Sequence, residues 1–217
     1  MPALPDEPER DCTRCPRLAA FRAGNRAAHP DWHNAPVPSF GPLDAHVLIV
    51  GLAPGLKGAN RTGRPFTGDH AGQLLYRTLE ACGFTSGRFA ERANDGLRLI
   101  DCRIVNAVRC VPPANKPLPA EVAACRGFLK SELAALAKLR VVLALGQIAH
   151  GAVLAALGLR SSAYRFGHGA RHALPDGLWL VDSYHCSRLN TNTGRLTEIM
   201  FRAVIEDAKS RIERSAA

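Results

Sequence analysis

Short apolar runs alternate along this chain with segments of helical pattern, and this alternation constrains the fold more than any other feature. The predicted strands, which are mostly apolar, lie at residues 47–50, 103–108, 141–145 and 178–184. The segments of helical pattern lie at residues 17–28, 70–82, 119–139, 147–157 and 193–212. Strands that alternate with helices form a parallel sheet covered on both faces. The sequence therefore predicts one α/β domain over residues 1–217, a three-layer α/β/α sandwich with a central four-stranded parallel sheet.

The segment after the first apolar run is rich in glycine, proline and basic residues. It extends from Gly51 to Asp69 and has the sequence GLAPGLKGANRTGRPFTGD. Open α/β sheets bind ligands at the carboxyl ends of their strands, and glycine lets backbone N–H groups approach a phosphate closely. The segment has neither the GxxxxGK[ST] nor the GxGxxG pattern. It therefore predicts a phosphate-handling loop that differs from ordinary nucleotide sites.

Polar residues also end two of the other predicted strands, namely Asn106 and His185. Because parallel strands end at one edge of the sheet, both side chains are expected to converge with the glycine-rich loop. A histidine at the end of an apolar strand can donate a hydrogen bond to developing negative charge. A lone histidine is more often structural, but the neighbouring Ser187, Arg188 and Asn190 favour a functional role for His185.

The chain has seven cysteines, and their odd number and unequal spacing argue against a disulfide framework. Cys12 and Cys15 form a CxxC pair, and Cys110 and Cys125 lie far downstream. Four thiolates can hold a zinc ion or a [4Fe–4S] cluster. Zinc ribbons usually use two CxxC pairs and this chain has one, which favours the cluster. Cys82 and Cys102 are expected to be buried apolar side chains, and Cys186, beside His185, is ambiguous.

Charge and hydropathy indicate the kind of partner. The chain has 28 basic and 19 acidic residues and a net charge of +9, which favours nucleic acid, although a generally basic surface would give the same count. No apolar run approaches the roughly 20 residues of a membrane span, and the acidic, proline-rich beginning is unlike a signal peptide. A cytoplasmic, DNA-associated monomer without a membrane partner is therefore expected.

Three segments carry a resemblance to a known family, and the first and last of them are long, specific motifs. The glycine-rich loop, the RCVPPANKP segment at residues 109–117 and the HCSRLNTNTGRLT segment at residues 185–197 resemble the family 5 (type B) uracil-DNA glycosylases. The resemblance extends from Cys12 to Met200. It implies a uracil-glycosylase α/β/α fold and excision of uracil, often also of hypoxanthine and xanthine, from DNA. One departure is Cys186, since many relatives have proline there.

The resemblance also implies roles for individual residues. Asn106 would hold the attacking water, His185 would face the flipped base, Phe66 would stack on that base, and Asp69 would assist, although an aspartate at a helix start is often only a cap. Ala53 and its neighbour lie where other glycosylase families carry an acid, so the water would be positioned without a strong base there.

The complete predicted site is larger. The predicted catalytic residues are Asn106, His185 and Asp69. The predicted substrate-binding residues are Gly51, Ala53, Pro54, Gly55, Phe66, Asn106 and His185. The predicted DNA contacts are Lys57, Arg61, Arg64, Ser187, Arg188 and Asn190. The resemblance implies a [4Fe–4S] cluster that packs segment 12–28 on the domain, with the ligands Cys12, Cys15, Cys110 and Cys125.

Two other functional classes fit parts of the sequence: a non-catalytic DNA-binding iron–sulfur protein and a small iron–sulfur redox protein. Polar residues that converge on strand ends favour an enzyme over a binding module. The sequence shows neither an exposed cluster nor a partner surface, as a redox protein would need. A monofunctional DNA glycosylase acting on DNA with deaminated bases is the prediction, with the preferred base left open.

Overall fold

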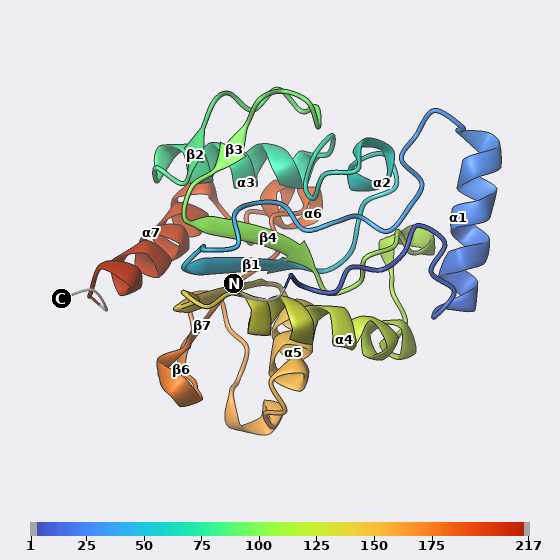
Figure 1. The fold of residues 1–217 in the computed structure, drawn as a ribbon. Coiled ribbons are helices and arrows are strands. Elements are labelled where there is room, and N and C mark those ends of the chain that lie inside the picture. Colours follow the sequence, from blue (N-terminus) through green and yellow to red (C-terminus); the bar gives the residue numbers. More distant parts are fainter. Residues whose placement is uncertain (1–3, 215–217) are drawn as a thin grey trace.

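A computed structural model, which describes residues 4–214, contains a five-stranded sheet between two layers of helices (Figure 1). The strand order is β4-β1-β5-β7-β6. The strand bounds are β1 (Val47–Gly51), β4 (Cys102–Asn106), β5 (Val141–Leu145), β6 (Arg171–Ala173) and β7 (Trp179–Ser183). The parallel pairs β1·β4, β1·β5 and β5·β7 confirm the predicted four-stranded parallel core.

The fifth strand corrects the predicted strand number. β6 pairs antiparallel with β7 at the edge of the sheet, within a segment that the sequence predicted to be a loop. Its three residues are polar or small and show no apolar run. Pairing with β7 creates this strand, and such tertiary pairing leaves no local sequence signal.

Helices connect the strands as predicted, with some changes at their ends. Their bounds are α1 (Pro16–Ala28), α2 (Ala59–Thr62), α3 (His70–Ala81), α4 (Pro119–Ala135), α5 (Gln147–Ala156), α6 (Arg188–Asn192) and α7 (Glu198–Arg214). A separate two-stranded sheet and three 3-10 turns complete the fold: β2 (Thr85–Ser86), β3 (Arg98–Leu99), η1 (Pro113–Asn115), η2 (Ser161–Ala163) and η3 (Pro175–Gly177). The predicted helix over residues 193–212 begins later, because Gly194 has a left-handed backbone (φ 70°) between α6 and α7.

Alternate residues of the parallel strands pack on opposite faces of the sheet. Ile49 and Leu143 belong to the apolar core that includes residues of α3 and α7. Leu48 and Val142 belong to the core that includes residues of α4 and α5. Because both faces are covered, β1 and β5 are continuous apolar runs rather than alternating apolar and polar residues.

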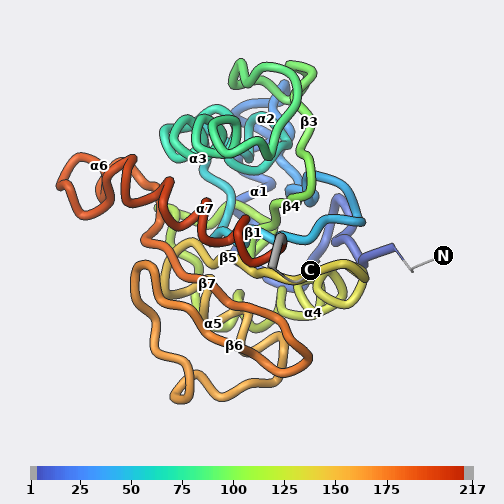
Figure 2. Tube along the Cα trace, turned by 90° about the vertical axis from the view of Figure 1, so that its left-hand side faces the viewer, coloured from blue at the N-terminus to red at the C-terminus, as the bar shows by residue number. Residues whose placement is uncertain are grey.

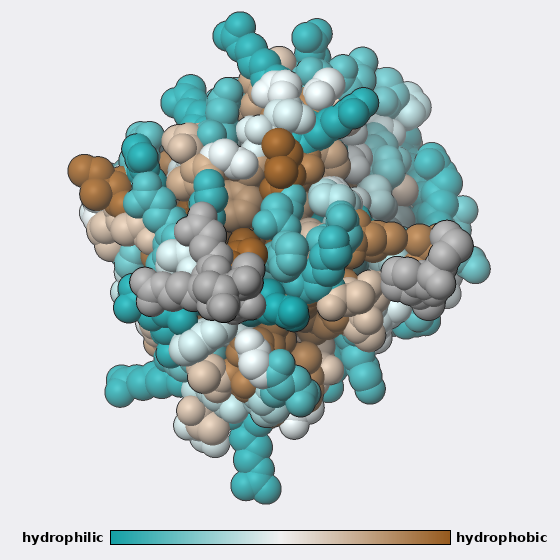
Figure 3. Space-filling view, turned by 60° about the vertical axis from the view of Figure 1, so that its left-hand side comes forward, coloured by the Kyte–Doolittle hydropathy of each residue, from teal (hydrophilic) through white to brown (hydrophobic). Residues whose placement is uncertain are grey.

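The outside of the molecule shows two further features. In Figure 2, α6 and the turn that follows it project from the body. On the face drawn in Figure 3, hydrophilic side chains predominate and hydrophobic residues form small separate groups. No helix within residues 4–214 is long and apolar enough to cross a membrane.

Candidate active site

A cavity of about 860 Å³ lies at the carboxyl ends of β1 and β4. Three predicted segments line it: the glycine-rich loop, the end of β4 and the segment after β7. The predicted residues that line it are Ala53, Pro54, Gly55, Lys57, Phe66, Asp69, Asn106, His185, Ser187 and Arg188. The topology thus brings together residues that are far apart in sequence.

Asn106 lies deep in this cavity, at the last position of β4. Its side chain is 3% exposed, and its Oδ1 has no hydrogen-bond partner within the described chain. Gly51 pairs with Asn106 in the sheet register and lies behind it instead of lining the cavity. A Cβ on Gly51 would collide with Asn106 Oδ1 and lie 2.6 Å from the Phe66 ring. A buried, unpaired amide oxygen is costly, so this atom is suited to accept a hydrogen bond from a water or a base.

Phe66 forms one wall of the cavity in an unusual backbone conformation. Its φ is 51°, a left-handed value that costs a non-glycine residue about 1–3 kcal/mol. The ring is 6% exposed, and its centroid lies 6.0 Å from that of the His185 imidazole, with 30° between the planes. The aromatic face and the imidazole therefore border the same space.

His185 follows β7 and is held by the segment after it. Burial lowers the pKa of His185 to about 4, so the ring is neutral at pH 7. The Asn190 side chain donates a hydrogen bond to the His185 backbone oxygen at 2.8 Å. Asn190 therefore supports the loop from behind and does not line the cavity. Cys186 is fully buried, which resolves its ambiguity in favour of an apolar, structural side chain.

The low pKa of His185 predicts a pH dependence. The ring stays neutral in the folded protein down to about pH 4, whereas the unfolded chain takes up this proton near 6.5. The unfolded state therefore binds more protons between these values, and stability is lost as the pH falls through this window. Thermal denaturation at about pH 7 and pH 5 should show a smaller acid-induced loss for His185→Asn than for the wild type. An equal loss in both proteins would contradict the assignment.

Asp69 begins α3 and combines two roles. Its Oδ1 accepts a hydrogen bond from the Gly72 backbone N–H at 3.1 Å, which makes it the N-cap of the helix. The other carboxylate oxygen packs on the loop, since a Cβ on Gly55 would lie 2.9 Å from it. Burial raises the pKa of Asp69. Asp69 is therefore both the N-cap of α3 and part of the cavity lining.

The prediction that Arg64 contacts DNA is wrong. Arg64 is 4% exposed, and its guanidinium makes two hydrogen bonds to the Asp95 carboxylate, at 2.7 and 2.8 Å. The partner lies 31 residues further along the chain, so nothing local distinguished this arginine from a phosphate ligand. Arg61 is exposed on α2 but lies outside the cavity lining.

Two residues of interest escaped the sequence analysis. Asn115 lines the cavity from the proline-rich segment, in a left-handed turn conformation (φ 56°). Leu189 follows Arg188 on the projecting α6 and is 72% exposed. An apolar residue inside the polar run SRLNTN was the available signal for Leu189.

The four predicted ligand cysteines occupy a second site. Cys110 and Cys125 are buried in one apolar cluster, against which Cys15 packs. Burial raises the pKa of Cys15 and of Cys110 to about 11, and electrostatic repulsion from the other cysteines of the quartet adds to both shifts. The Arg22 guanidinium donates a hydrogen bond to Cys110 Sγ at 3.3 Å. The structure thus places Cys15, Cys110 and Cys125 together, with Cys12 near enough to interact electrostatically with each of them. Cys82 and Cys102 are buried in a different core, as predicted.

Comparison with known proteins identifies the class of this fold and site. Residues 38–209 match the model of the Uracil DNA glycosylase superfamily, and the chain belongs to that superfamily. The type-5 uracil-DNA glycosylase of Thermus thermophilus is 49% identical over 204 residues, covering 91% of this chain and 92% of the relative. The type-5 uracil-DNA glycosylase of Pyrobaculum aerophilum is 41% identical, covering 86% and 83%. A type-4 uracil-DNA glycosylase of the same organism is 35% identical, covering 70% and 64%. The predicted family resemblance is confirmed.

Proposed function

We propose that this protein is a monofunctional, type-5 uracil-DNA glycosylase, which hydrolyses the N-glycosidic bond of uracil, and of hypoxanthine and xanthine, in DNA. The observation that carries the proposal is the convergence of Phe66, Asn106 and a neutral His185 on one cavity. The chain's identity to type-5 enzymes over nearly its whole length supports it.

The cavity suits a nucleotide that has left the duplex. A glycosylase must flip its target out of the stack at a cost of a few kcal/mol, and stacking on Phe66 would return roughly 1–3 kcal/mol. Ala53 and Gly55 line the cavity with minimal side chains. Larger side chains at these two positions would narrow the cavity, so the small residues permit a purine, which supports hypoxanthine and xanthine as additional substrates.

The chemistry follows from two polar groups at the strand ends. As the bond from C1′ breaks, its electron pair moves onto the base, and the sugar gains positive charge. The neutral His185 ring donates an N–H to the negative charge that develops on the base. Water held by the Oδ1 of Asn106 adds to C1′ and releases one proton, which leaves the abasic sugar neutral and converts the departing base anion into the neutral free base. Asp69 assists from the loop, where its pKa is raised by burial.

Asn115 provides the competing candidate for the water ligand, because it lines the same cavity. We assign the water to Asn106, whose oxygen is buried and unpaired, while Asn115 is exposed. Asn115→Ala should therefore retain more single-turnover activity than Asn106→Ala. The reverse order would transfer the water-holding role to Asn115.

The exposed Leu189 would enter the stack vacated by the flipped base.

Lys57 and Arg188 are exposed at the cavity and would contact phosphates. Lys57→Ala and Arg188→Ala should each reduce the slope of log affinity against log salt by about 1 for undamaged duplex. Lys138→Ala is the matched control, because this exposed lysine pairs with Asp44 at the amino ends of the strands. Anisotropy titrations at several salt concentrations measure the slopes, and an unchanged slope in both cavity variants would contradict the assignment.

We also propose a [4Fe–4S] cluster bound by the predicted ligand cysteines. Within residues 4–214, only His150, His172 and Asp182 form a group of three whose ligand atoms lie within 4.8 Å of one another. Among any three of these cysteines, at least two sulfurs are therefore more than 4.8 Å apart, whereas sulfurs around one zinc ion with bonds of about 2.3 Å lie roughly 3.8 Å apart. Three of the four cysteines lie in one apolar cluster, and Arg22 donates a hydrogen bond to one of them, which fits the larger anionic group. When bound, the cluster would join segment 12–28 to the domain.

The same proposal places the protein in the cytoplasm as a monomer whose partner is DNA with deaminated bases. All seven cysteines are unpaired, which suits a reducing compartment.

A panel of duplexes tests the proposed substrates. Each carries uracil, hypoxanthine, xanthine or cytosine at one labelled position, and strand cleavage by alkali reports each excised base. We expect cleavage with the three deaminated bases and none with cytosine. Cleavage with uracil alone would restrict the substrate range, and binding without any cleavage would favour the non-catalytic DNA-binding protein.

A further inference from the structure

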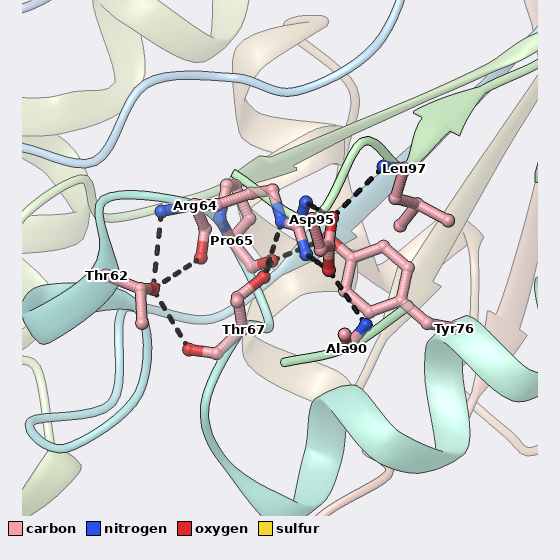
Figure 4. A network of polar contacts seen from close by, with 8 residues as sticks. All are labelled: Thr62, Arg64, Pro65, Thr67, Tyr76, Ala90, Asp95 and Leu97. Carbon is pink, nitrogen blue, oxygen red and sulfur yellow. Dashed lines mark hydrogen bonds and ion pairs between the residues drawn. The ribbon is translucent and has the colours of Figure 1, made fainter. Parts of the chain in front are cut away.

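The wall of the cavity that would stack on the base is held in a strained conformation from outside the cavity. Phe66 has a φ of 51°, which persists only where the surrounding structure enforces it. A polar network binds the residues on both sides of Phe66 (Figure 4). The network therefore holds Pro65 and Thr67, the neighbours of Phe66, in place.

Arg64 forms the centre of this network. Its Nη1 and Nη2 donate to the two Asp95 oxygens, and its Nε donates to Thr67 Oγ1 at 2.8 Å. The guanidinium also lies 5.2 to 5.6 Å from the ring centroids of Phe40, Tyr76 and Phe89. A planar cation with two bonds to one carboxylate and aromatic rings around it has little freedom to turn.

Asp95 is fixed in turn by its own loop. Its two oxygens accept hydrogen bonds from the backbone N–H groups of Ala90 and Leu97, at 2.9 and 3.1 Å. The pKa of the Asp95 carboxyl lies well below its usual range. Burial alone would raise this pKa, but the hydrogen bonds from Arg64 and from the backbone of the loop outweigh burial. The carboxylate therefore stays charged at neutral pH and connects loop 87–97 with the segment around Phe66.

The backbone beside Phe66 is held by further contacts. The Tyr76 hydroxyl donates to the Pro65 carbonyl at 2.7 Å, and the Thr62 hydroxyl donates to the Thr67 carbonyl at 3.0 Å. A Cβ on Gly72 would collide with the Phe66 carbonyl oxygen, so α3 packs directly on this backbone. The position of the ring is thus set by groups on several elements.

We propose that Asp95, acting through Arg64, is a positioning residue that sets how Phe66 meets the flipped base. The inference rests on the proposed glycosylase function, because it assigns Phe66 to the base. Asp95 lies outside the cavity lining and so touches no substrate. Loop 87–97, which belongs to none of the three family motifs, would through this contact govern the rate of excision.

A double-mutant cycle between Asp95 and Phe66 tests the proposal. Asp95→Asn is expected to lower the single-turnover rate of uracil excision roughly 10- to 100-fold, as a small misplacement of a positioned group can. Affinity for undamaged duplex should change less than about twofold, since phosphate contacts supply it. In the Phe66→Ala background, Asp95→Asn should change the rate by less than about twofold, because the group it positions is gone.

Glu132→Gln provides the matched control. Glu132 is also a buried carboxylate paired with buried arginines, Arg103 and Arg109, but it has no contact with the segment around Phe66. Any effect of Glu132→Gln should be the same with phenylalanine or alanine at position 66. This comparison separates a general loss of stability from an effect that acts through the ring.

Tyr76→Phe provides a second, milder test in case Asp95→Asn folds poorly. It removes only the hydroxyl that donates to the Pro65 carbonyl. Melting temperatures verify that each variant is folded during the assay. Tyr76→Phe should lower the rate roughly threefold, again only while Phe66 is present. Equal effects of Asp95→Asn in both backgrounds, or no effect in either, would overturn the positioning role alone. Absence of excision by the wild type would overturn the proposed function, and this inference with it.

Discussion

His185→Ala is expected to lower the single-turnover rate of uracil excision by roughly 100- to 1,000-fold, the usual loss when one donor to developing charge is removed. The side chain lies at the cavity, and its ring is neutral at pH 7 and able to donate. The rate should be measured with enzyme in excess over a duplex that contains one uracil. Affinity for undamaged duplex should remain nearly unchanged, because phosphate contacts dominate it.

His29→Ala is the control for this variant, since His29 stacks on Trp32 and lies outside the cavity lining.

Asn106→Ala should lower the same rate at least about tenfold, on the scale of a lost polar contact in the transition state. Asp69→Ala should have a smaller effect, part of it through the lost helix cap. An unaltered rate for Asn106→Ala would refute its role in holding water.

Cys110→Ser and Cys125→Ser are expected to cause the largest loss of cofactor and stability. The wild type should contain about four irons per chain, and each of these variants should lose most of the iron and melt at a lower temperature. Cys82→Ser and Cys102→Ser are matched controls, because these cysteines are equally buried but lie in a different core. They should keep the iron content. Finding one zinc and no iron in the wild type, or equal effects of all four changes, would contradict the cluster assignment.

The parallel core and the meeting of the site residues could be predicted because they depend on local signals. The buried strands are short and mostly apolar, and Gly51 and Asn106 mark the carboxyl ends of β1 and β4. Once the strands are known to be parallel, Asn106 and His185 must lie at the same edge as the glycine-rich loop. The placement of these residues required no knowledge of side-chain contacts.

The features that the sequence did not predict depend on distant partners. Arg64 looks like a phosphate ligand within its loop, and only Asp95, on another loop, determines its role as an ion-pair residue. β6 becomes a strand only through its pairing with β7. Asn115 joins the cavity because the proline-rich segment turns back over it, which depends on two consecutive left-handed residues.

Release of free uracil from a duplex with one uracil tests the central claim most directly. Cluster-loaded protein is mixed with the duplex, and the free base is quantified by chromatography before and after alkali treatment of the strand. We predict that one uracil is released per duplex while the strand stays intact until alkali is added, and that His185→Ala releases it far more slowly. Binding of the duplex with no release of uracil would contradict the claim and identify a non-catalytic DNA-binding protein.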